Sequence, residues 1–331
     1  MRLAPVLAAA ALALSACQAG TTQSGTPPTA NTSALTGAPT STTIGSVHRV
    51  RLHVTVMPWR LPQPLAREAL SCAGGARVTV AGGMIAGDAS TAAAYVLDLT
   101  TGRVTRLPSL AVPVHDTAGW CLDGNPVAIG GGNATEQDAV QERRGRRWQV
   151  VGHLPHTRSD LVVESVGGRA FALGGYNGTG GAEPAILTST DGRRWDREGR
   201  LPVPVRYGAG VVAVGAMWLF GGEVDHVMQT AVQRIDADGH ARVVARLPQP
   251  LGHASAVLLG DRILLVGGRT GTTTQTGRMW WFDPATARFT RAGRLPTTLT
   301  DSAVVGAGRA AYLVGGETPG ISDRVVRLTF R

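Results

Sequence analysis

Short apolar runs that end in a pair of glycines recur along most of the chain. Residues 217–220, 263–266 and 311–314 each hold four apolar residues, and each run is followed directly by Gly-Gly. Runs of this length between turn signals are typical of strands buried on both faces. Paired glycines suit a point where the backbone bends or is approached closely. The pattern therefore predicts a series of short, buried strands.

Two markers keep the same period through six units of the chain. The Gly-Gly pairs begin at Gly82, Gly131, Gly174, Gly221, Gly267 and Gly315. The Leu-Pro pairs begin at Leu61, Leu107, Leu154, Leu201, Leu247 and Leu295. Both series recur every 43 to 49 residues, and each unit reads as four strands. A repeat of this length is typical of propeller blades, so we predict an all-β propeller with six four-stranded antiparallel blades.

The third and fourth strands of the units show a resemblance to a known repeat. The segment WFDP at 281–284, followed by Phe289, resembles the third strand, turn and fourth strand of the kelch repeat. The segment YVLD at 95–98, followed by Thr101 and Gly102, is a second match. The chain from about residue 50 to 331 is therefore similar to kelch-type β-propellers. Such a resemblance implies a fold far more firmly than a function.

The two ends of the repeat region complement each other. The last unit reaches residues 325–328 and stops before a fourth strand, whereas an alternating stretch at 50–56 precedes the first Leu-Pro pair. We expect this N-terminal strand to complete the last blade. That arrangement would leave no open sheet edge between the first and last units.

The N-terminus has the features of an export signal. An arginine at position 2 precedes an apolar stretch at 3–14, which is too short to span a membrane well. The tetrapeptide LSAC at 14–17 resembles the bacterial lipobox, which implies that residues 1–16 are removed and that Cys17 is lipidated. Two or more acyl chains would hold the chain on a membrane. The alternative is an ordinary secretory cleavage site.

The segment that follows Cys17 reads as a tether. Residues 18–46 are rich in Thr, Ser, Pro and Gly, and they carry no charge. Such a composition cannot bury enough apolar surface to fold. We therefore predict three parts: a signal peptide at 1–16, the lipidated cysteine with a disordered tether at 17–46, and the propeller at 47–331. The expected location is the outer face of the cytoplasmic membrane.

The chain is basic, with a net charge of +9. Positive charge favours anionic surroundings such as phospholipid headgroups or acidic wall polymers, although it could also serve solubility alone. No arginine cluster alternates with aromatic residues, so we do not expect nucleic acid as a partner. The expected state is a monomer.

Two cysteines other than Cys17 occupy matching positions in the first two units. Cys72 and Cys121 lie 49 residues apart, and an exported protein can keep a disulfide. Equivalent positions in neighbouring blades point the same way, which can leave two sulfurs too far apart for a bond. The sequence leaves both readings open: a disulfide, or two small buried residues.

A polar position recurs where the innermost strand of each blade should begin at the central channel. It is occupied by Arg67, Asp116, Asp160, Tyr207, His253 and Asp301. Arg158 and Arg206 lie close to it in the sequence, as do Glu68 and His115. Side chains of these types could hold a cation or grip a polar sugar at the channel mouth, where propeller loops converge. Alternatively, they bond to one another and only seal the ring.

The chain contains no pattern that assigns catalysis. It has no zinc-ligand spacing and no phosphate-binding loop, so we predict neither a metal nor a cofactor and assign no catalytic residues. We expect a binding or scaffold protein whose partner is an envelope protein or glycan. The rival is a sugar-active enzyme, similar in plan to the bacterial sialic acid mutarotase. In that case Asp116, Asp160, Asp301 and His253 are the candidate acids and bases.

Overall fold

The computed structural model describes residues 52–330, which form strands, turns and loops. The expected signal peptide, Cys17 and the tether lie outside the described residues. Within residues 52–330 no helix has the length and apolar character needed to cross a membrane.

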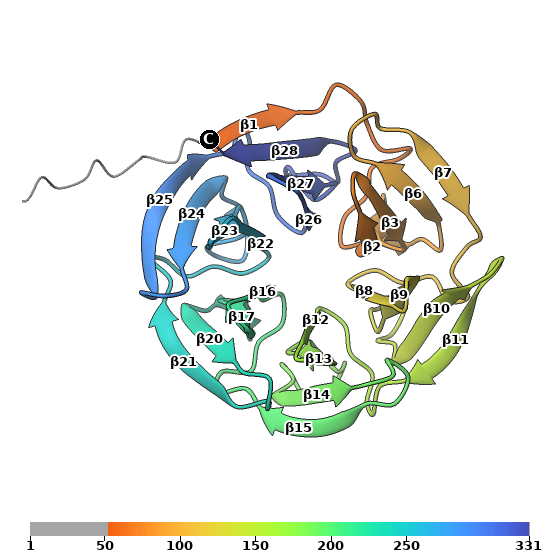
Figure 1. The fold of residues 1–331 in the computed structure, drawn as a ribbon, viewed down its shortest axis with the longest axis horizontal. Coiled ribbons are helices and arrows are strands. Elements are labelled where there is room, and N and C mark those ends of the chain that lie inside the picture. The colour runs from red at the N-terminus through yellow and green to blue at the C-terminus, as the bar shows by residue number, and fades with distance from the viewer. Residues whose placement is uncertain (1–51, 331) are drawn as a thin grey trace, which may run out of the picture. The chain divides into compact units, whose positions relative to one another are not determined.

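Six four-stranded antiparallel sheets surround a central axis, which confirms the predicted all-β, six-bladed propeller (Figure 1). Blade 1 contains β2 (Ala69–Gly74), β3 (Arg77–Ala81), β6 (Ala94–Asp98) and β7 (Val104–Leu107). Blade 2 contains β8 (Ala118–Leu122), β9 (Asn125–Ile129), β10 (Ala139–Arg144) and β11 (Arg147–His153). Blade 3 contains β12 (Val162–Val166), β13 (Arg169–Leu173), β14 (Ala185–Ser189) and β15 (Asp196–Arg200).

The second half of the ring follows the same order. Blade 4 contains β16 (Ala209–Ala213), β17 (Ala216–Phe220), β20 (Ala231–Ile235) and β21 (Ala241–Arg246). Blade 5 contains β22 (Ser255–Leu259), β23 (Arg262–Val266), β24 (Arg278–Asp283) and β25 (Arg288–Arg294). Blade 6 contains β26 (Ala303–Ala307), β27 (Ala310–Val314), β28 (Val325–Phe330) and β1 (Leu52–Val56).

Blade 6 joins the two ends of the ring, as the sequence predicted. Strand β1 pairs antiparallel with β28, from Leu52 opposite Phe330 to Val56 opposite Val326. The strand from the N-terminal side thus supplies the outermost strand of the last blade, and this pairing closes the ring.

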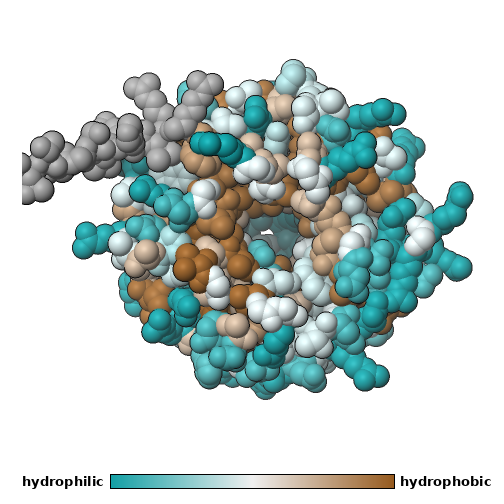
Figure 2. All heavy atoms as spheres, in the orientation of Figure 1, coloured by the Kyte–Doolittle hydropathy of each residue, from teal (hydrophilic) through white to brown (hydrophobic). Residues whose placement is uncertain are grey.

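The alternation of strand direction gives the disc two distinct faces. One face, the turn face, carries the short turns within each blade. These turns join the first strand to the second and the third strand to the fourth. Strand β1 also begins on the turn face. On the loop face lie the longer loops between second and third strands and the links between blades. Two small hairpins that we did not predict extend from these loops: β4 (Met84–Ile85) with β5 (Ala89–Ser90), and β18 (Glu223–Val224) with β19 (Val227–Met228). Figure 2 shows a central hollow surrounded by apolar and weakly polar side chains, with hydrophilic ones toward the rim.

The glycine pairs join each blade to the next. The first glycine of each pair has a φ of 56–66° and the second a φ of 93–109°, both in the region that favours glycine. The second glycine donates its N–H to a backbone carbonyl of the next blade at 2.8 or 2.9 Å. In blade 2 this pair is Gly130-Gly131, so our assignment of Gly131-Gly132 was wrong by one residue.

The core lies between neighbouring sheets. One cluster packs Phe171 and Ile186 of blade 3 against Met217, Leu219 and Ile235 of blade 4, and all five are essentially inaccessible to water. Fully burying one such side chain contributes about 1.5–3 kcal/mol. Each blade is therefore stabilised mainly by its two neighbours.

The structure settles the open question about the two cysteines, because Cys72 and Cys121 form a disulfide. Their Cα atoms lie 4.7 Å apart. Strand β2 has an irregular register beyond Ser71, with Cys72 at a φ of 47°, so its backbone departs from ideal pleating. Gly119 of β8 meanwhile lies directly against the backbone of Leu70, leaving no space for a side chain. Both features bring equivalent strands closer than regular blades would allow.

Candidate functional site

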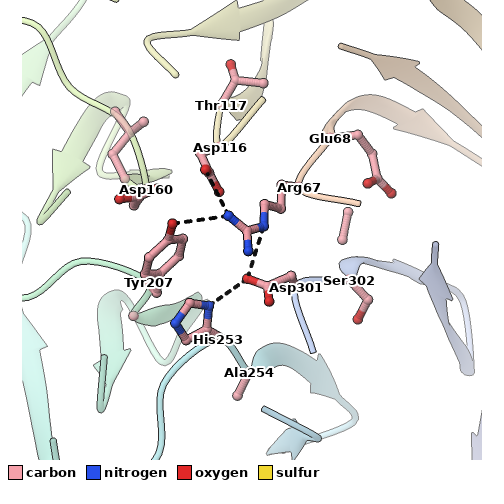
Figure 3. A pocket seen from close by; sticks show the side chains of 13 residues that line it. Arg67, Glu68, Asp116, Thr117, Asp160, Tyr207, His253, Ala254, Asp301 and Ser302 are labelled. Atoms are coloured by element: carbon pink, nitrogen blue, oxygen red, sulfur yellow. Dashed lines mark hydrogen bonds and ion pairs between the residues drawn. The ribbon is translucent and has the colours of Figure 1, made fainter. Parts of the chain in front are cut away.

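The six polar positions predicted from the repeat meet around the channel on the loop face (Figure 3). We call them the channel ring: Arg67, Asp116, Asp160, Tyr207, His253 and Asp301. Each has a φ between 51° and 60°. Each also donates its backbone N–H to the carbonyl of the preceding ring member at 2.9–3.2 Å, and Arg67 closes the circle by donating to Asp301. The backbone conformation is thus common to all six positions, whereas the side chains differ.

Arg67 crosses the mouth of the channel. Its Nη1 donates to Oδ2 of Asp116 at 3.3 Å and to the hydroxyl oxygen of Tyr207, three blades away, at 3.2 Å. Its Nη2 donates to Glu317 at 3.0 Å, and its Nε lies 3.7 Å from Asp301. Because four acceptors surround it, this guanidinium is the central positive charge of the site (Figure 3).

A second layer of charged residues supports the ring. Glu223, Arg269 and Glu317 occupy the same place in three blades, directly after the glycine pair. Arg269 donates to Asp301 at 3.0 Å and to Glu317 at 2.8 Å, while His253 bridges Asp301 at 2.7 Å and Glu223 at 3.2 Å. We did not predict these three residues. The signal that could have found them is the position next to each glycine pair, where charge appears in only half of the units.

Opposite charges set the protonation of His253 and Asp301. Burial alone would lower the pKa of His253, but Asp301 and Glu223 outweigh it and raise that pKa above its usual value. Burial would raise the pKa of Asp301, yet His253, Arg67 and Arg269 hold it well below its usual range. The pairing therefore favours the charged form of each group, an imidazolium bonded to a carboxylate.

Asp160 is a buried carboxyl group that lies beside Asp116 in the ring. Burial raises the pKa of Asp160 well above its usual range, and the neighbouring Asp116 raises it further. Arg206, whose Nη2 lies 2.7 Å from Asp160, and Arg67 act in the opposite direction. Burial and these two carboxyl groups also raise the pKa of Tyr207, whose ring stacks on His253 at 3.9 Å. Asp160 is thus the ring carboxyl most prone to hold a proton.

Glu68 lies beside the ring without a hydrogen-bond partner. Its side chain lines the cavity and is 4% exposed, and neither carboxyl oxygen has a hydrogen-bond partner among residues 52–330. Burial raises its pKa to about 8. Tyr95 has a buried hydroxyl that is likewise unpartnered within the described range, and burial, followed by the charge of Glu68, raises its pKa.

The structure separates Arg158 from the other candidates. Arg158 occupies the position that holds Leu or Val in the other blades, and it is fully buried between blades rather than lining the cavity. It donates to the carbonyl of Ala185 at 3.1 Å and to Glu183 at 3.4 Å, and burial lowers its pKa to about 10. Its predicted place at the channel mouth was therefore wrong.

The other neighbours of the ring lie where the sequence placed them. Arg206 stacks over the rings of Tyr176 and Tyr207 at 4.6 and 4.5 Å. The Nε2 atom of His115 lies 3.4 Å from Asp116, and its Nδ1 lies 2.8 Å from Ser90. The ring and the residue that follows each member enclose a cavity of about 140 Å³. This volume suits a small polar group that can both donate and accept hydrogen bonds.

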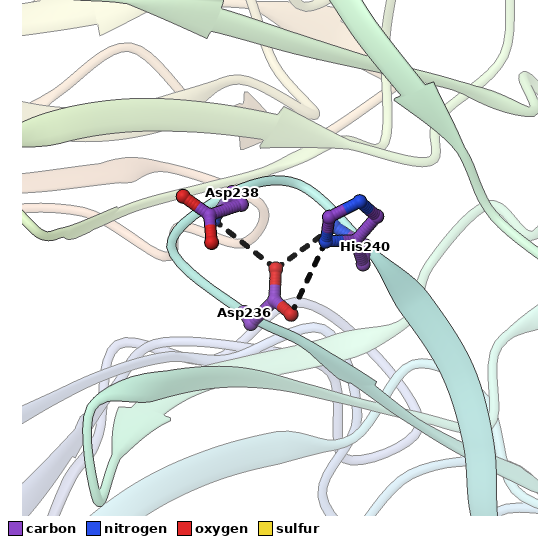
Figure 4. Close-up of side chains that lie close together, drawn as sticks. All are labelled: Asp236, Asp238 and His240. Carbon is purple, nitrogen blue, oxygen red and sulfur yellow. Dashed lines mark hydrogen bonds and ion pairs between the residues drawn. The ribbon is translucent and has the colours of Figure 1, made fainter.

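A separate cluster, Asp236, Asp238 and His240, lies in the turn between β20 and β21 (Figure 4). Its potential ligand atoms lie within 4.8 Å of one another. Asp236 accepts backbone N–H groups from Asp238 at 3.1 Å and from His240 at 2.9 Å, which accounts for its position as a turn-forming residue. We assign it no metal.

Known proteins resemble the chain at the level of repeat and fold. The family model described as Kelch motif matches residues 250–296, which span blade 5. "Kelch-like protein 25" of Xenopus tropicalis is 24% identical over 212 residues, covering 59% of this chain and 36% of that protein. The chain thus spans about a third of the length of this curated relative. The solved "Structure of YjhT" superposes with a TM-score of 0.70 at 16% identity, covering 82% of this chain and 99% of that one. These findings support a kelch-repeat protein with a propeller fold.

Proposed function

We propose that this chain is an exported, membrane-anchored binding protein that presents the loop face of its propeller to an envelope protein or glycan. The proposal rests mainly on the channel ring, where donors and acceptors from all six blades converge on one cavity. Such a cavity is the usual place for a ligand on a fold of this kind. The lipobox-like segment that ends at Cys17 supports anchorage.

A paired substitution at the channel ring tests this binding role. Asp160→Ala combined with Arg206→Ala removes both side chains of one contact at the channel mouth, so neither is left without its partner. We expect binding to a panel of envelope glycans, measured by calorimetry on the purified propeller, to weaken at least about tenfold, the effect of about 1.4 kcal/mol. Asp236→Ala, in the exposed turn of Figure 4, should bind like the wild type. Unchanged glycan binding by the paired variant would assign the ring a purely structural role.

A sugar-active enzyme is the second candidate, and one observation favours it. Burial raises the pKa of Asp160 well above its usual range, so one site places a carboxyl group prone to hold a proton beside a second carboxyl group, Asp116. Interconversion of sugar anomers needs a proton delivered and a proton removed, which such a pair can do. NMR measurement of anomer exchange by the purified propeller separates the two candidates. If the propeller exchanges anomers no faster than buffer for every sugar of a broad panel, the enzymatic role is excluded.

A further inference from the structure

A large groove lies on the turn face between blades 6 and 1, remote from the channel ring. It encloses about 630 Å³. Its walls come from the β26–β27 turn, the end of β28 and two turns of blade 1. The lining residues are Gly75, Ala76, Thr100, Ala307, Gly308, Arg309, Ala310, Tyr312, Arg327, Thr329 and Phe330.

The groove carries positive charge without a compensating acid. Arg309 and Arg327 are both exposed, and neither has a carboxylate partner within 4.0 Å among residues 52–330. None of the lining residues is acidic. This differs from the channel mouth, where Arg67 of the ring and its neighbours Arg206 and Arg269 are all paired. Two exposed guanidinium groups that have no acidic partner within the described residues are well suited to an anion.

The strands fix how these groups lie. Arg327 is directly opposite Tyr312 of β27 and Thr55 of β1, so all three share one side of the blade 6 sheet. The guanidinium of Arg309 lies over the ring of Phe330, 5.5 Å from its centroid. The hydroxyl-bearing residues Thr100, Tyr312 and Thr329 line the same groove. The groove therefore combines cationic groups, hydroxyl groups and an aromatic wall.

The start of the propeller lies at this groove. Leu52, the first residue of β1, pairs with Phe330. The described part of the chain therefore begins on the turn face. If residues 18–46 form the tether that their composition predicts, a segment of that length spans roughly 30 Å on average. If Cys17 holds the chain at a membrane, the turn face is the face that the tether brings close to it.

We propose that the groove between blades 6 and 1 binds the phosphate headgroup of an anionic phospholipid, so that the turn face rests on the membrane. Arg309 and Arg327 hold the phosphate, and the hydroxyl groups of the wall bond to its oxygens or to the glycerol. The loop face, with the channel ring, then points away from the membrane toward the proposed partner. The inference rests on the proposed membrane location, but its test does not need the lipid on Cys17.

The test uses the unlipidated chain, residues 18–331, with its disulfide formed. We expect it to co-sediment with vesicles of phosphatidylglycerol and phosphatidylcholine, and not with phosphatidylcholine alone. Arg309→Ala combined with Arg327→Ala should weaken binding about thirtyfold, because each arginine near an anionic surface contributes about 1 kcal/mol. The matched control is Arg200→Ala combined with Arg294→Ala, which removes two exposed arginines where β15 and β25 reach the loop face. It should bind like the wild type.

Several outcomes would overturn the proposal. One is equal loss of vesicle binding in both paired variants, which would indicate general charge attraction, and another is no binding by the wild-type chain. Tight binding of soluble glycerol phosphate that persists without vesicles would assign the groove to a free phosphate. Near-ultraviolet circular dichroism confirms that each variant is folded. Mass spectrometry of the mature N-terminus tests lipidation of Cys17 separately, so failure of the anchor and failure of the groove remain distinguishable.

Discussion

Gly221→Ala is expected to destabilise the propeller by about 4 kcal/mol or more, at the upper end of single-substitution effects. Gly221 has a φ of 56°, which costs about 1 kcal/mol for a residue with a Cβ atom. The added Cβ would also overlap the carbonyl oxygen of Leu251 in the next blade, where backbone atoms cannot easily yield. Gly222 donates its N–H to that same carbonyl at 2.9 Å, so relief of the overlap would break a bond between blades.

Urea unfolding of the oxidised protein measures this effect, with Gly215→Ala as the control. Gly215 has a similar φ of 65°, but a Cβ there would meet no atom within 4 Å. The control should therefore lose only about 1 kcal/mol, the cost of the backbone conformation. Equal losses at the two sites would show that close approach between blades is not what each pair requires.

The sequence predicted the repeat well because each marker has a local physical cause. A residue other than glycine at position 221 would collide with the next blade, so the glycine pairs persist in all six units. The position of Arg67 could be transferred to the five other blades because the same turn begins every innermost strand. Pairing of β1 with β28 was predictable because the last unit lacked a fourth strand and a spare strand preceded the first unit.

The errors and omissions arose where the repeat is irregular or contacts are long-range. Three consecutive glycines in blade 2 offered two registers, which the φ angles and the bond from Gly131 to the carbonyl of Arg158 distinguish. Arg158 itself was assigned to the channel mouth because it lies close to Asp160 in the sequence, although its position in the repeat is one that Leu or Val fills elsewhere. The contact between Arg67 and Tyr207 crosses the channel, and the periodicity of a sequence contains no information on such distances.

The channel ring combines a repeated backbone with side chains that do not repeat. All six backbone positions are needed to close the circle of hydrogen bonds. Any residue that tolerates a left-handed backbone conformation could meet that need. Asp and His are favoured there, but Arg67 and Tyr207 are not. The guanidinium of Arg67 donates a hydrogen bond to the hydroxyl oxygen of Tyr207 across the channel mouth. Their side-chain contact, rather than the backbone conformation, therefore accounts for these two residue types. For this reason we regard the side chains, and not the turn, as the feature to test for ligand binding.

Glu68→Gln is expected to stabilise the protein at pH 8 by about 4 kcal/mol and to have little effect at pH 4. Burial raises the pKa of Glu68 to about 8 in the folded state, compared with 4.5 for an unperturbed glutamate. Between those two values the folded protein binds a proton that the unfolded chain has released, so stability falls as the pH rises. Each pH unit in this window costs about 1.4 kcal/mol. An amide carries no charge, so the variant avoids this loss.

The measurement is the free energy of unfolding in urea from pH 4 to pH 8 for the wild type and the variant. The difference between the two curves isolates Glu68, because every other titrating group, including Asp160, is present in both proteins. Glu136→Gln is the matched control, since Glu136 is a partly exposed glutamate on the loop face. Its curve should run parallel to that of the wild type. Parallel curves for Glu68→Gln as well would mean that this buried carboxyl has a partner, such as an ordered water, that keeps it ionised.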